Sequence, residues 1–295
     1  MIARERWLVW LFIAPAAILV GVLMYYPMIG TVIESFYSAS FISPQPTFVG
    51  LKLYNELFAN AGFYQIVWNS LVWTVIVVLL QNLLGFLVAL LLNQQLPGQG
   101  MLRALILLPW VLPGVVAAVL WRFMYDPQLG LINSFLMSLG LTGTGMAWLG
   151  EPSMAMGAAI IAAVWKGFPF STVVYLAALQ NVDREQVEAA TVDGAGPIAR
   201  LFDVILPAMR EVVMINVILT TVFTFNYFDM IWVLTRGGPQ NATHIFPTKI
   251  FELGFGQFRF GEAAVYGVFS ILVLVLLIML YFAVQRTGRS WRRSQ

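Results

Sequence analysis

The stretch EAATVDGAGPIARLFDVILP, residues 188–207, is a polar interruption in a chain whose other long segments are apolar. It carries the charged residues Glu188, Asp193, Arg200 and Asp203, and runs rich in Leu, Val and Ile border it on both sides. Its glycines and proline are typical of short helices joined by a bend. The role of this stretch in the fold therefore depends on the structure that the bordering apolar runs adopt.

The composition indicates a membrane protein. Of 295 residues, 60% are hydrophobic and 10% are charged, and the mean hydropathy is +0.83, whereas soluble domains carry about 25% charged residues. Several apolar runs reach the roughly 20 residues that a helix needs to cross a bilayer core. The alternating strands of about ten residues that form outer-membrane barrels are not seen in the sequence. The sequence therefore predicts an all-α, polytopic membrane protein.

The residue content excludes several classes of chemistry. The chain has no cysteine, which excludes disulfides, thiol catalysis and cysteine-ligated metals. Its one histidine, His244, argues against a histidine-based metal site or catalytic triad. The net charge of +2 is too small to indicate a nucleic-acid partner. We expect no catalytic residue, metal or cofactor in this chain, and no enzyme activity.

Six transmembrane helices are predicted in a single domain covering residues 1–295. The expected spans are about 7–30, 67–92, 104–124, 154–179, 211–234 and 263–285. The first apolar run is longer than the ~7–15 residues of a signal peptide, so we expect an uncleaved helix. Six spans place both termini on one side of the membrane.

Basic residues predict the orientation, because Lys and Arg concentrate in cytoplasmic loops. With cytoplasmic termini, ten of the 16 basic residues face the cytoplasm and six do not. Arg4 and Arg6 precede the first span, and the tail RTGRSWRRSQ, residues 286–295, carries four arginines and no acid. Both termini and the stretch 188–207 are therefore expected in the cytoplasm.

Around this stretch the sequence predicts two short helices separated by a bend. Asp183 is a suitable N-cap, Gly194 suits the left-handed conformation that ends a helix, and Pro197 suits the first turn of the next. Pro207 is expected to stop or kink the second helix. The side chains expected to be buried on one face of that helix are Ile198, Leu201, Phe202 and Ile205. These residues alone are compatible with an interfacial connector or with a docking element, although an acidic helix suits a protein groove better than anionic lipid.

The same stretch resembles the EAA loop of binding-protein-dependent ABC importer permeases. Glu188-Ala189-Ala190 is followed by Gly194, Val204 and Leu206-Pro207 at the spacing of that motif, with Val204 where Ile is common. A second element is similar to the carbohydrate-type permeases, of the maltose and glycerol-3-phosphate first-permease kind, and consists of Thr235, Gly237, Gly238 and Pro239. FVGLKLYNELF at 48–58 and VWKGFPF at 164–170 also fit that type, so the resemblance covers nearly the whole chain.

The resemblance implies a type I ABC importer permease fold and a transport subunit driven by other chains. The sequence has no G-x-x-x-x-G-K-[ST] motif, so ATP and Mg would be bound by partner ATPase subunits. The implied partners are a sister permease forming a heterodimer, two ATPase subunits, and a periplasmic or lipid-anchored solute-binding protein. The implied location is the cytoplasmic (inner) membrane of a bacterium or archaeon, and the implied cargo is a sugar, oligosaccharide or related polyol or sugar phosphate.

Family resemblance also implies two contact regions. The coupling loop would span residues 181–207 and contact the ATPase through Glu188, Ala189, Ala190, Asp193, Gly194, Ala195, Leu206 and Pro207. The loop containing Thr235, Gly237, Gly238 and Pro239 would face outside, where it would either dock the binding protein or serve as a plain solvent-exposed connector. His244 is expected to be an ordinary loop residue.

Polar residues inside the spans are the candidates for a substrate pathway, because such groups usually face protein or water. These candidates are Gln81, Asn82, Lys166, Asn226, Tyr227, Asp229 and Trp232. Asn226 and Asp229 are three residues apart and are expected on one helical face, with Tyr227 or Trp232 available to stack on a sugar ring. The alternatives are that the amides join helices, that Asp229 pairs with Lys166 or Arg122, and that Lys166 caps helix carbonyls.

Two other functional classes compete with an ABC permease. A self-contained secondary transporter or channel would usually show internal repeats of spans, and we find no convincing repeat. A membrane-embedded enzyme would require clustered histidine, cysteine or acidic groups, which this sequence lacks.

Overall fold

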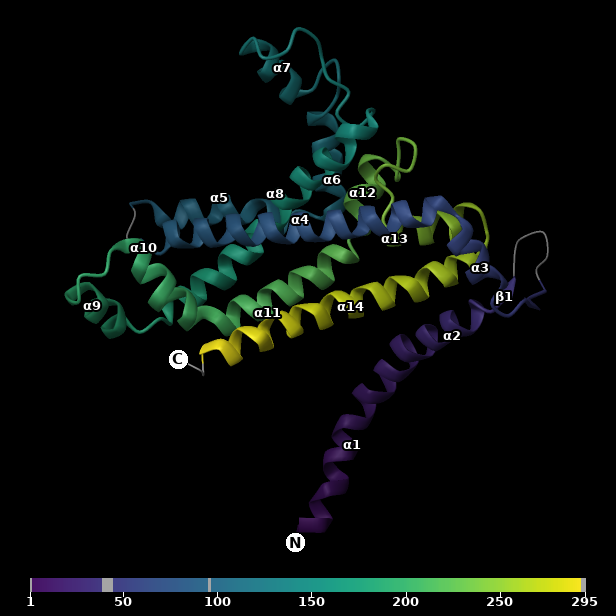
Figure 1. Ribbon diagram of the computed structural model, residues 1–295, viewed down its shortest axis with the longest axis horizontal. Helices are drawn as coiled ribbons and strands as arrows, with labels where there is room; N and C mark the ends of the chain where they lie inside the picture. The colour runs from purple at the N-terminus through teal and green to yellow at the C-terminus, as the bar shows by residue number, and fades with distance from the viewer. Residues whose placement is uncertain (1, 39–44, 95–96, 293–295) are drawn as a thin grey trace. The chain divides into compact units, whose positions relative to one another are not determined.

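The computed structural model describes residues 2–38, 45–94 and 97–292 (Figure 1). Arg293, one of the basic residues used to predict the orientation, lies outside the described residues. Backbone contacts divide the chain into two compact units, one comprising Met1–Phe63 with Lys249–Gln295 and the other comprising Tyr64–Thr248. Each unit is described by itself.

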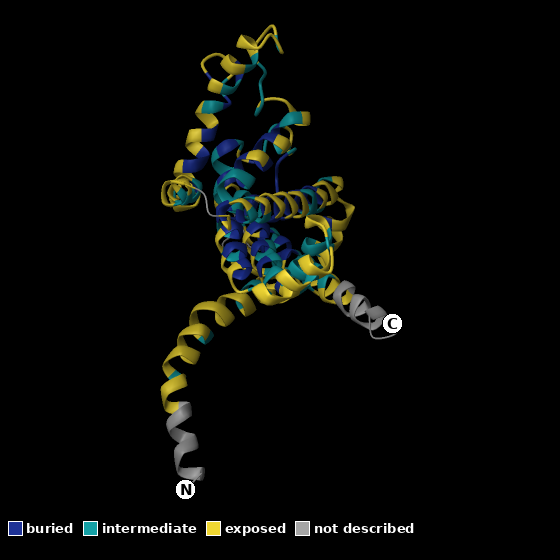
Figure 2. Ribbon diagram, turned by 90° about the vertical axis from the view of Figure 1, so that its left-hand side faces the viewer, coloured by how far each residue is buried: buried dark blue, intermediate teal, exposed yellow. Residues whose placement is uncertain are grey.

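The first unit begins with a long apolar helix that carries no buried residue over Leu11–Glu34 (Figure 2). Its elements are α1 (Ile2–Val20), the π-helical turn η1 (Gly21–Tyr25), α2 (Tyr26–Glu34), β1 (Tyr37–Ser38), β2 (Thr47–Phe48), α3 (Lys52–Ala59), the π-helical turn η3 (Glu252–Gly256) and α14 (Phe260–Arg292). β1 and β2 pair antiparallel with Tyr37 opposite Phe48, and this short two-stranded sheet accompanies the helices of the predicted all-α fold. Exposed apolar side chains on a helix of this length suit a lipid or protein environment rather than water.

An aromatic cluster holds α3 against α14 in this unit. The ring of Phe269 lies 5.2 Å from Phe58, 5.4 Å from Phe63 and 6.1 Å from Tyr54, measured between centroids. The Tyr54 hydroxyl and Ser35 Oγ are hydrogen-bonded at 2.6 Å, which joins α3 to the end of α2. These contacts form the core of the first unit.

The second unit is a bundle of helices around α4 and α8. Its elements are α4 (Ala61–Leu92), α5 (Gln99–Val111), α6 (Gly114–Met124), α7 (Leu131–Ser138), α8 (Pro152–Gln180), α9 (Arg184–Val192), α10 (Pro197–Arg200), the π-helical turn η2 (Leu201–Ile205), α11 (Leu206–Phe225), α12 (Phe228–Leu234) and α13 (Phe246–Phe251). Small residues on α8 and α6 allow close helix packing, and the alanines buried there are Ala117, Ala118, Ala158, Ala159, Ala162 and Ala163. Trp73 is fully buried in this core, and its indole N–H donates to the Thr224 carbonyl at 2.9 Å.

Two predicted spans are broken rather than continuous. The span expected over 104–124 consists of α5 and α6, which are bent by 96° at Leu112–Pro113. Leu112 has an extended ψ of 138° because a residue before proline is disfavoured in the helical region. The span expected over 211–234 is interrupted at Asn226 and Tyr227, where Tyr227 adopts φ −77° and ψ 92°.

The number of spans stays a prediction. Within the described residues, four helices are long and apolar enough to cross a membrane, or five when the bent α5–α6 pair counts as one span. Those four are Leu11–Glu34, Ala61–Leu92, Pro152–Gln180 and Phe260–Ala283. They correspond to the expected spans 7–30, 67–92, 154–179 and 263–285.

Candidate functional site

The 181–207 segment folds as its local sequence predicts at three points. The Asp183 carboxylate accepts a hydrogen bond of 3.0 Å from the Glu185 N–H and so caps α9. Gly194 has φ +83°, and α9 ends there with Ala195 N–H donating to the Ala190 carbonyl at 2.9 Å. This is the Schellman arrangement that a glycine after a helix permits. Pro197 occupies the first turn of α10, as expected.

Of the two alternatives predicted for Pro207, a helix stop or a kink, the stop is wrong. The helix runs from α10 through η2 into α11, and Pro207 lies in the first turn of α11. The π-helical turn η2 directly precedes it, with the Leu206 N–H donating five residues back to the Leu201 carbonyl. A widened turn accommodates the missing N–H and the ring of a proline without ending the helix. Across the bend, Arg200 Nη1 donates to Thr191 Oγ1 at 2.8 Å and joins the two helices.

The apolar face expected to be buried in this segment is partly exposed. Ile198 is 74% exposed and Phe202 is 60% exposed, whereas Leu201 and Ile205 are half-buried. Val192, at the end of α9, is 88% exposed. The chain itself does not cover these side chains, so the segment presents an apolar surface together with the carboxylates of α9.

Half of the contact residues implied by family resemblance are exposed at this surface. Glu188, Ala189, Asp193 and Gly194 are exposed, and Ala190, Ala195, Leu206 and Pro207 are half-buried. In Figure 1, α9 and α10 lie at the end of the second unit where α4 ends, and α12 lies toward the other end. Because α4 is long and apolar enough to span a bilayer, the two ends of this unit suit opposite membrane faces.

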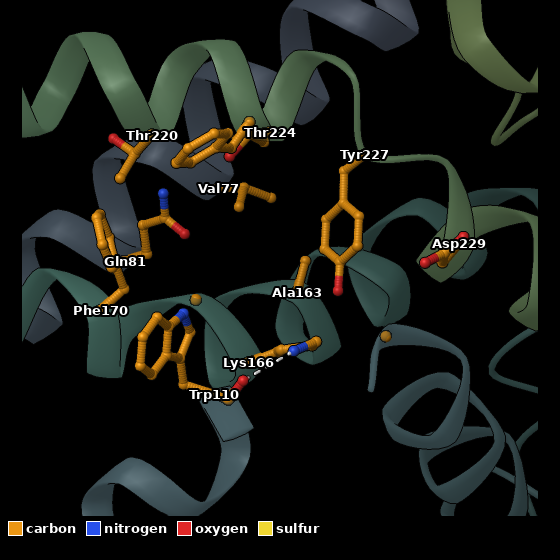
Figure 3. Close-up of a pocket in the computed structure, with 13 residues that line it drawn as sticks. Val77, Gln81, Trp110, Ala163, Lys166, Phe170, Thr220, Thr224, Tyr227 and Asp229 are labelled. Atoms are coloured by element: carbon orange, nitrogen blue, oxygen red, sulfur yellow. Dashed lines mark hydrogen bonds between the residues drawn. The ribbon is translucent and has the colours of Figure 1, made fainter. Parts of the chain in front are cut away.

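A cavity of about 460 Å³ lies inside the second unit, between the broken helices (Figure 3). It is lined by Val77, Gln81, Trp110, Gly114, Ala163, Lys166, Gly167, Phe170, Thr220, Phe223, Thr224, Tyr227 and Asp229. Aromatic rings and a few polar groups share its wall, which is the usual make-up of a small-molecule site. Both breaks border the cavity, at Trp110–Gly114 and at Tyr227–Asp229.

Four of the seven predicted pathway residues line this cavity, and three do not. Gln81, Lys166, Tyr227 and Asp229 form part of its wall, whereas Asn82, Asn226 and Trp232 do not. The Asn226 side chain is exposed and donates back to the Val222 carbonyl at 2.9 Å. The Trp232 ring stacks on Phe228 with centroids 5.5 Å apart.

The expectation that Asn226 and Asp229 share a helical face is wrong. Asn226 is the C-cap residue after α11 and Asp229 lies in the first turn of α12, with Tyr227 in an extended conformation between them. Helical spacing does not apply across such a break. Sequence reasoning also missed the cavity aromatics Trp110, Phe170 and Phe223, because aromatic residues are common in any apolar span.

Lys166 caps backbone carbonyls at the α5–α6 break. Its Nζ donates to the Leu112 carbonyl at 2.8 Å and approaches the Trp110 carbonyl at 3.4 Å (Figure 3). Among the described residues, no salt bridge joins Asp229 to Lys166 or to Arg122, although the Asp229 carboxylate interacts electrostatically with Lys166 at longer range. Arg122 Nη1 instead donates to the Val233 carbonyl at 3.5 Å. The capping alternative is therefore confirmed and the buried ion pair is not.

Glycines bring the cavity walls close to their polar groups. A Cβ added at Gly167 would overlap the Gln81 amide oxygen, and a Cβ added at Gly114 would lie 2.8 Å from Asp229 Oδ2. The absence of side chains at these two positions leaves room for the Gln81 amide and the Asp229 carboxylate. The Tyr227 hydroxyl is buried and has no hydrogen-bond partner among the described residues.

The 235–244 turn is more compact than a plain connector. Thr235 Oγ1 and Thr243 Oγ1 are hydrogen-bonded at 2.6 Å, and Thr243 Oγ1 donates to the Gly238 carbonyl at 2.8 Å. Gly237 is buried with φ +83°, and a Cβ there would overlap the His244 ring. His244 is 4% exposed and its Nδ1 lies 3.1 Å from Thr248 Oγ1. It therefore forms part of the packed interior of the turn, and the expectation of an ordinary loop residue is wrong.

The exposed residues of this turn differ from the predicted contact residues. Gly237 is buried and Thr235 is paired inside the turn, whereas Arg236, Gln240 and Asn241 are exposed. The last three adopt positive φ angles of 53°, 50° and 62°. The motif therefore shapes the turn, and its neighbours form the accessible surface.

Residues 81–288 match the family described as the binding-protein-dependent transport system inner membrane component. The chain belongs to this family. It is 35% identical over 286 residues to the trehalose/maltose transport system permease protein MalF of Thermococcus litoralis, covering 97% of this chain and 95% of that protein. It is 30% identical over 283 residues to the sn-glycerol-3-phosphate transport system permease protein UgpA of Pectobacterium atrosepticum, covering 95% and 94%.

A solved structure shows the same fold. A chain of the bacterial alginate ABC transporter, crystallised in complex with an alginate pentasaccharide-bound periplasmic protein, superposes with a TM-score of 0.81 at 23% identity, covering 97% of this chain and 96% of that chain. The protein is thus an ABC importer permease with the type I permease fold, a transport component of the inner membrane rather than an enzyme. This family assignment decides against a self-contained secondary transporter or channel.

Proposed function

We propose that this permease translocates a sugar, oligosaccharide or related polyol or sugar phosphate through the cavity of its second unit. An external solute-binding protein, periplasmic or lipid-anchored, delivers the cargo, and a sister permease completes the membrane channel as a heterodimer. The relatives named for trehalose/maltose and sn-glycerol-3-phosphate, and the alginate transporter, support this class of cargo.

The cavity wall is the observation that carries this proposal. The rings of Trp110 and Phe170 lie 5.9 Å apart at one side of the cavity and offer apolar faces to a sugar ring. The Gln81 amide, the Tyr227 hydroxyl and the Asp229 carboxylate offer hydrogen bonds to hydroxyl groups (Figure 3). Rings combined with a few placed polar groups are the pattern of a site that orients a polyhydroxylated ligand.

Two ATPase subunits, which bind ATP and Mg, drive transport by docking on the 181–207 segment. The exposed Glu188, Ala189, Val192, Ile198 and Phe202 supply an apolar surface edged with acid, which suits a protein partner better than an anionic lipid surface. Closure of the ATPase dimer biases the helices that enter and leave this segment, α8 and α11, toward one of two states. The access of the cavity then changes from one side of the membrane to the other.

The orientation follows from this docking. The 181–207 segment and both termini lie in the cytoplasm, in agreement with the excess of arginine there. The 235–244 turn then lies outside and contacts the binding protein. Its motif residues Thr235, Gly237, Gly238 and Pro239 hold the turn, which presents Arg236, Gln240 and Asn241.

ATP-dependent uptake into proteoliposomes tests the proposed cargo and cavity together. The full complex of this permease, its sister permease, the ATPase subunits and the binding protein is supplied with radiolabelled trehalose, maltose and glycerol-3-phosphate. Trp110→Ala is expected to reduce uptake of the accepted compound, whereas Trp68→Ala, at an exposed tryptophan of α4 outside the cavity, is expected to preserve it. Failure of all three compounds, or equal uptake by both variants, argues against the proposal.

A further inference from the structure

A buried network of side-chain hydrogen bonds joins α4, α8 and α11 beside the cavity. At its centre, Asn82 Nδ2 donates to the Val78 carbonyl at 2.8 Å and to Thr220 Oγ1 at 3.0 Å. Asn82 Oδ1 accepts from Asn216 Nδ2 at 2.7 Å and from the Tyr175 hydroxyl. An asparagine side chain can donate two hydrogen bonds through its NH₂ group and accept two through its carbonyl oxygen, so Asn82 makes every hydrogen bond that it can.

The orientation of both amides follows from the backbone. The Val78 carbonyl is an acceptor, so Asn82 must turn its Nδ2 toward it and its Oδ1 toward Asn216. Asn216 must then present its Nδ2 to Asn82, and the remaining hydrogen of that group goes to Ser171 Oγ at 3.1 Å. This leaves Asn216 Oδ1 buried and without a hydrogen-bond partner among the described residues.

The network lies between the cavity and the 181–207 segment. Toward the cavity, Thr220 belongs both to the network and to the cavity wall. Toward the segment, Tyr175 belongs to an apolar cluster with Leu179 and Met209, against which Val182 and Ile205 pack. The network is therefore continuous with both regions through side-chain contacts.

Close helix packing supports the network. A Cβ added at Gly85 on α4 would overlap Ser171 Cβ and lie 3.0 Å from the Phe168 carbonyl on α8. At this separation the polar side chains of the three helices reach one another directly. Buried hydrogen bonds of this kind have few alternative geometries, so they favour discrete arrangements of the helices over gradual sliding.

We propose that Asn82 and Asn216 are positioning residues that transmit movement of the 181–207 segment to the cavity. Neither residue lines the cavity, and α8 and α11 are the helices that flank the segment. Asn216 Oδ1 is a buried acceptor without a partner among the described residues, so a shift of α11 can exchange hydrogen bonds instead of only breaking them. This inference rests on the proposed drive of the permease by ATPase subunits.

Distance measurements between spin labels test the inference without knowledge of the cargo. The chain has no cysteine, so label pairs are introduced directly, Val111→Cys with Leu219→Cys beside the cavity and Leu91→Cys with Gln186→Cys beside the segment. All four positions are exposed, on α5, α11, α4 and α9, and none belongs to the proposed docking surface. The full complex in lipid nanodiscs is measured without nucleotide and after trapping with ATP, Mg and vanadate.

In the wild-type background we expect trapping to shift the distances of both pairs. The double variant Asn82→Leu/Asn216→Leu removes both amides together. In this variant we expect trapping to shift the distance of the label pair beside the segment (the segment pair) and to leave the distance of the label pair beside the cavity (the cavity pair) unchanged. Shifts of both pairs in the double variant equal to wild type overturn the inference and leave the proposed function standing. No shift of either pair in the wild type overturns the proposed function and this inference with it.

A matched pair of tyrosine variants covers the case in which the double variant does not fold. Tyr175→Phe removes one hydroxyl from the network, and Tyr125→Phe removes a buried hydroxyl that donates to the Ala158 carbonyl at 2.9 Å, outside the network. We expect Tyr175→Phe to reduce the shift of the cavity pair and Tyr125→Phe to preserve it. Equal shifts in the two variants overturn the inference.

Discussion

The Lys166 ammonium donates a hydrogen bond of 2.8 Å to the Leu112 carbonyl, across the bend between α5 and α6. The bend ends the hydrogen-bonding of α5, and Pro113 lacks an N–H, so the carbonyls at this point need other donors. Lys166, on the neighbouring helix α8, supplies one. The charged group therefore fixes the shape of the cavity wall.

Replacement of Lys166 by methionine is expected to destabilise this wall. Methionine keeps most of the side-chain volume and removes the donor, which leaves the Leu112 carbonyl without this partner at a cost of about 1–3 kcal/mol. We expect a lower midpoint of thermal unfolding in detergent and reduced uptake. Lys166→Arg retains donors and is expected to be milder, and a methionine variant as stable and active as wild type would falsify this role.

Gly194 is expected to be intolerant of alanine where Gly196 is tolerant. Gly194 has φ +83°, a conformation that costs a non-glycine residue about 1–2 kcal/mol, whereas Gly196 has φ −67° and open space at its Cβ position. Gly194→Ala is expected to disturb the end of α9 and to lower uptake per ATP hydrolysed. Gly196→Ala is the matched control, and equal coupling in the two variants contradicts the prediction.

Local sequence signals predicted the turns of the 181–207 segment correctly because each depends on adjacent residues. Asp183, Gly194 and Pro197 act within a few residues of their own backbone. The exposure of Ile198 and Phe202 did not follow from the same pattern. Helical periodicity shows which face is apolar, but it does not show whether this chain or another covers that face.

The cavity was predictable only in part, because the sequence shows which residues of a span are polar but not which way their side chains point. Gln81 and Asn82 are neighbours on α4, yet Gln81 lines the cavity and Asn82 lies in a buried network. Distinguishing the two residues requires the positions of α8 and α11, and these helices are distant from α4 in the sequence. Pro113 was a local signal for the break in the predicted span 104–124, but continuous hydrophobicity concealed it.

Gly237→Ala is expected to disrupt the 235–244 turn. The added methyl group would overlap the His244 ring at a position with φ +83°, so both packing and backbone conformation oppose it. We expect faster hydrogen exchange across residues 235–244 and weaker binding of the solute-binding protein in a pull-down with the full complex. Gly143→Ala, which has open space at its Cβ position, is the control. Unchanged exchange in the Gly237 variant contradicts the packing described for the turn.

The turn after α6 is expected to respond to acid through Asp126. Its carboxylate accepts hydrogen bonds from the N–H groups of Leu129 at 2.8 Å and Gln128 at 2.9 Å, and these lower the pKa of Asp126. A lowered pKa in the folded state means that the charged form stabilises the turn above the unfolded-state pKa of about 3.9 and that this stabilisation is lost as the pH falls through the folded-state pKa.

Amide exchange at residues 128–129 measures this effect locally. At neutral pH, we expect Asp126→Asn to exchange faster than wild type after correction for intrinsic rates, because a neutral amide oxygen is a weaker acceptor than a carboxylate. Below the folded-state pKa the two proteins are expected to exchange at similar rates. Asp203→Asn, at an exposed aspartate of η2, controls for the loss of one charge. A difference between wild type and Asp126→Asn that persists undiminished in acid would show that ionisation of Asp126 does not hold the turn.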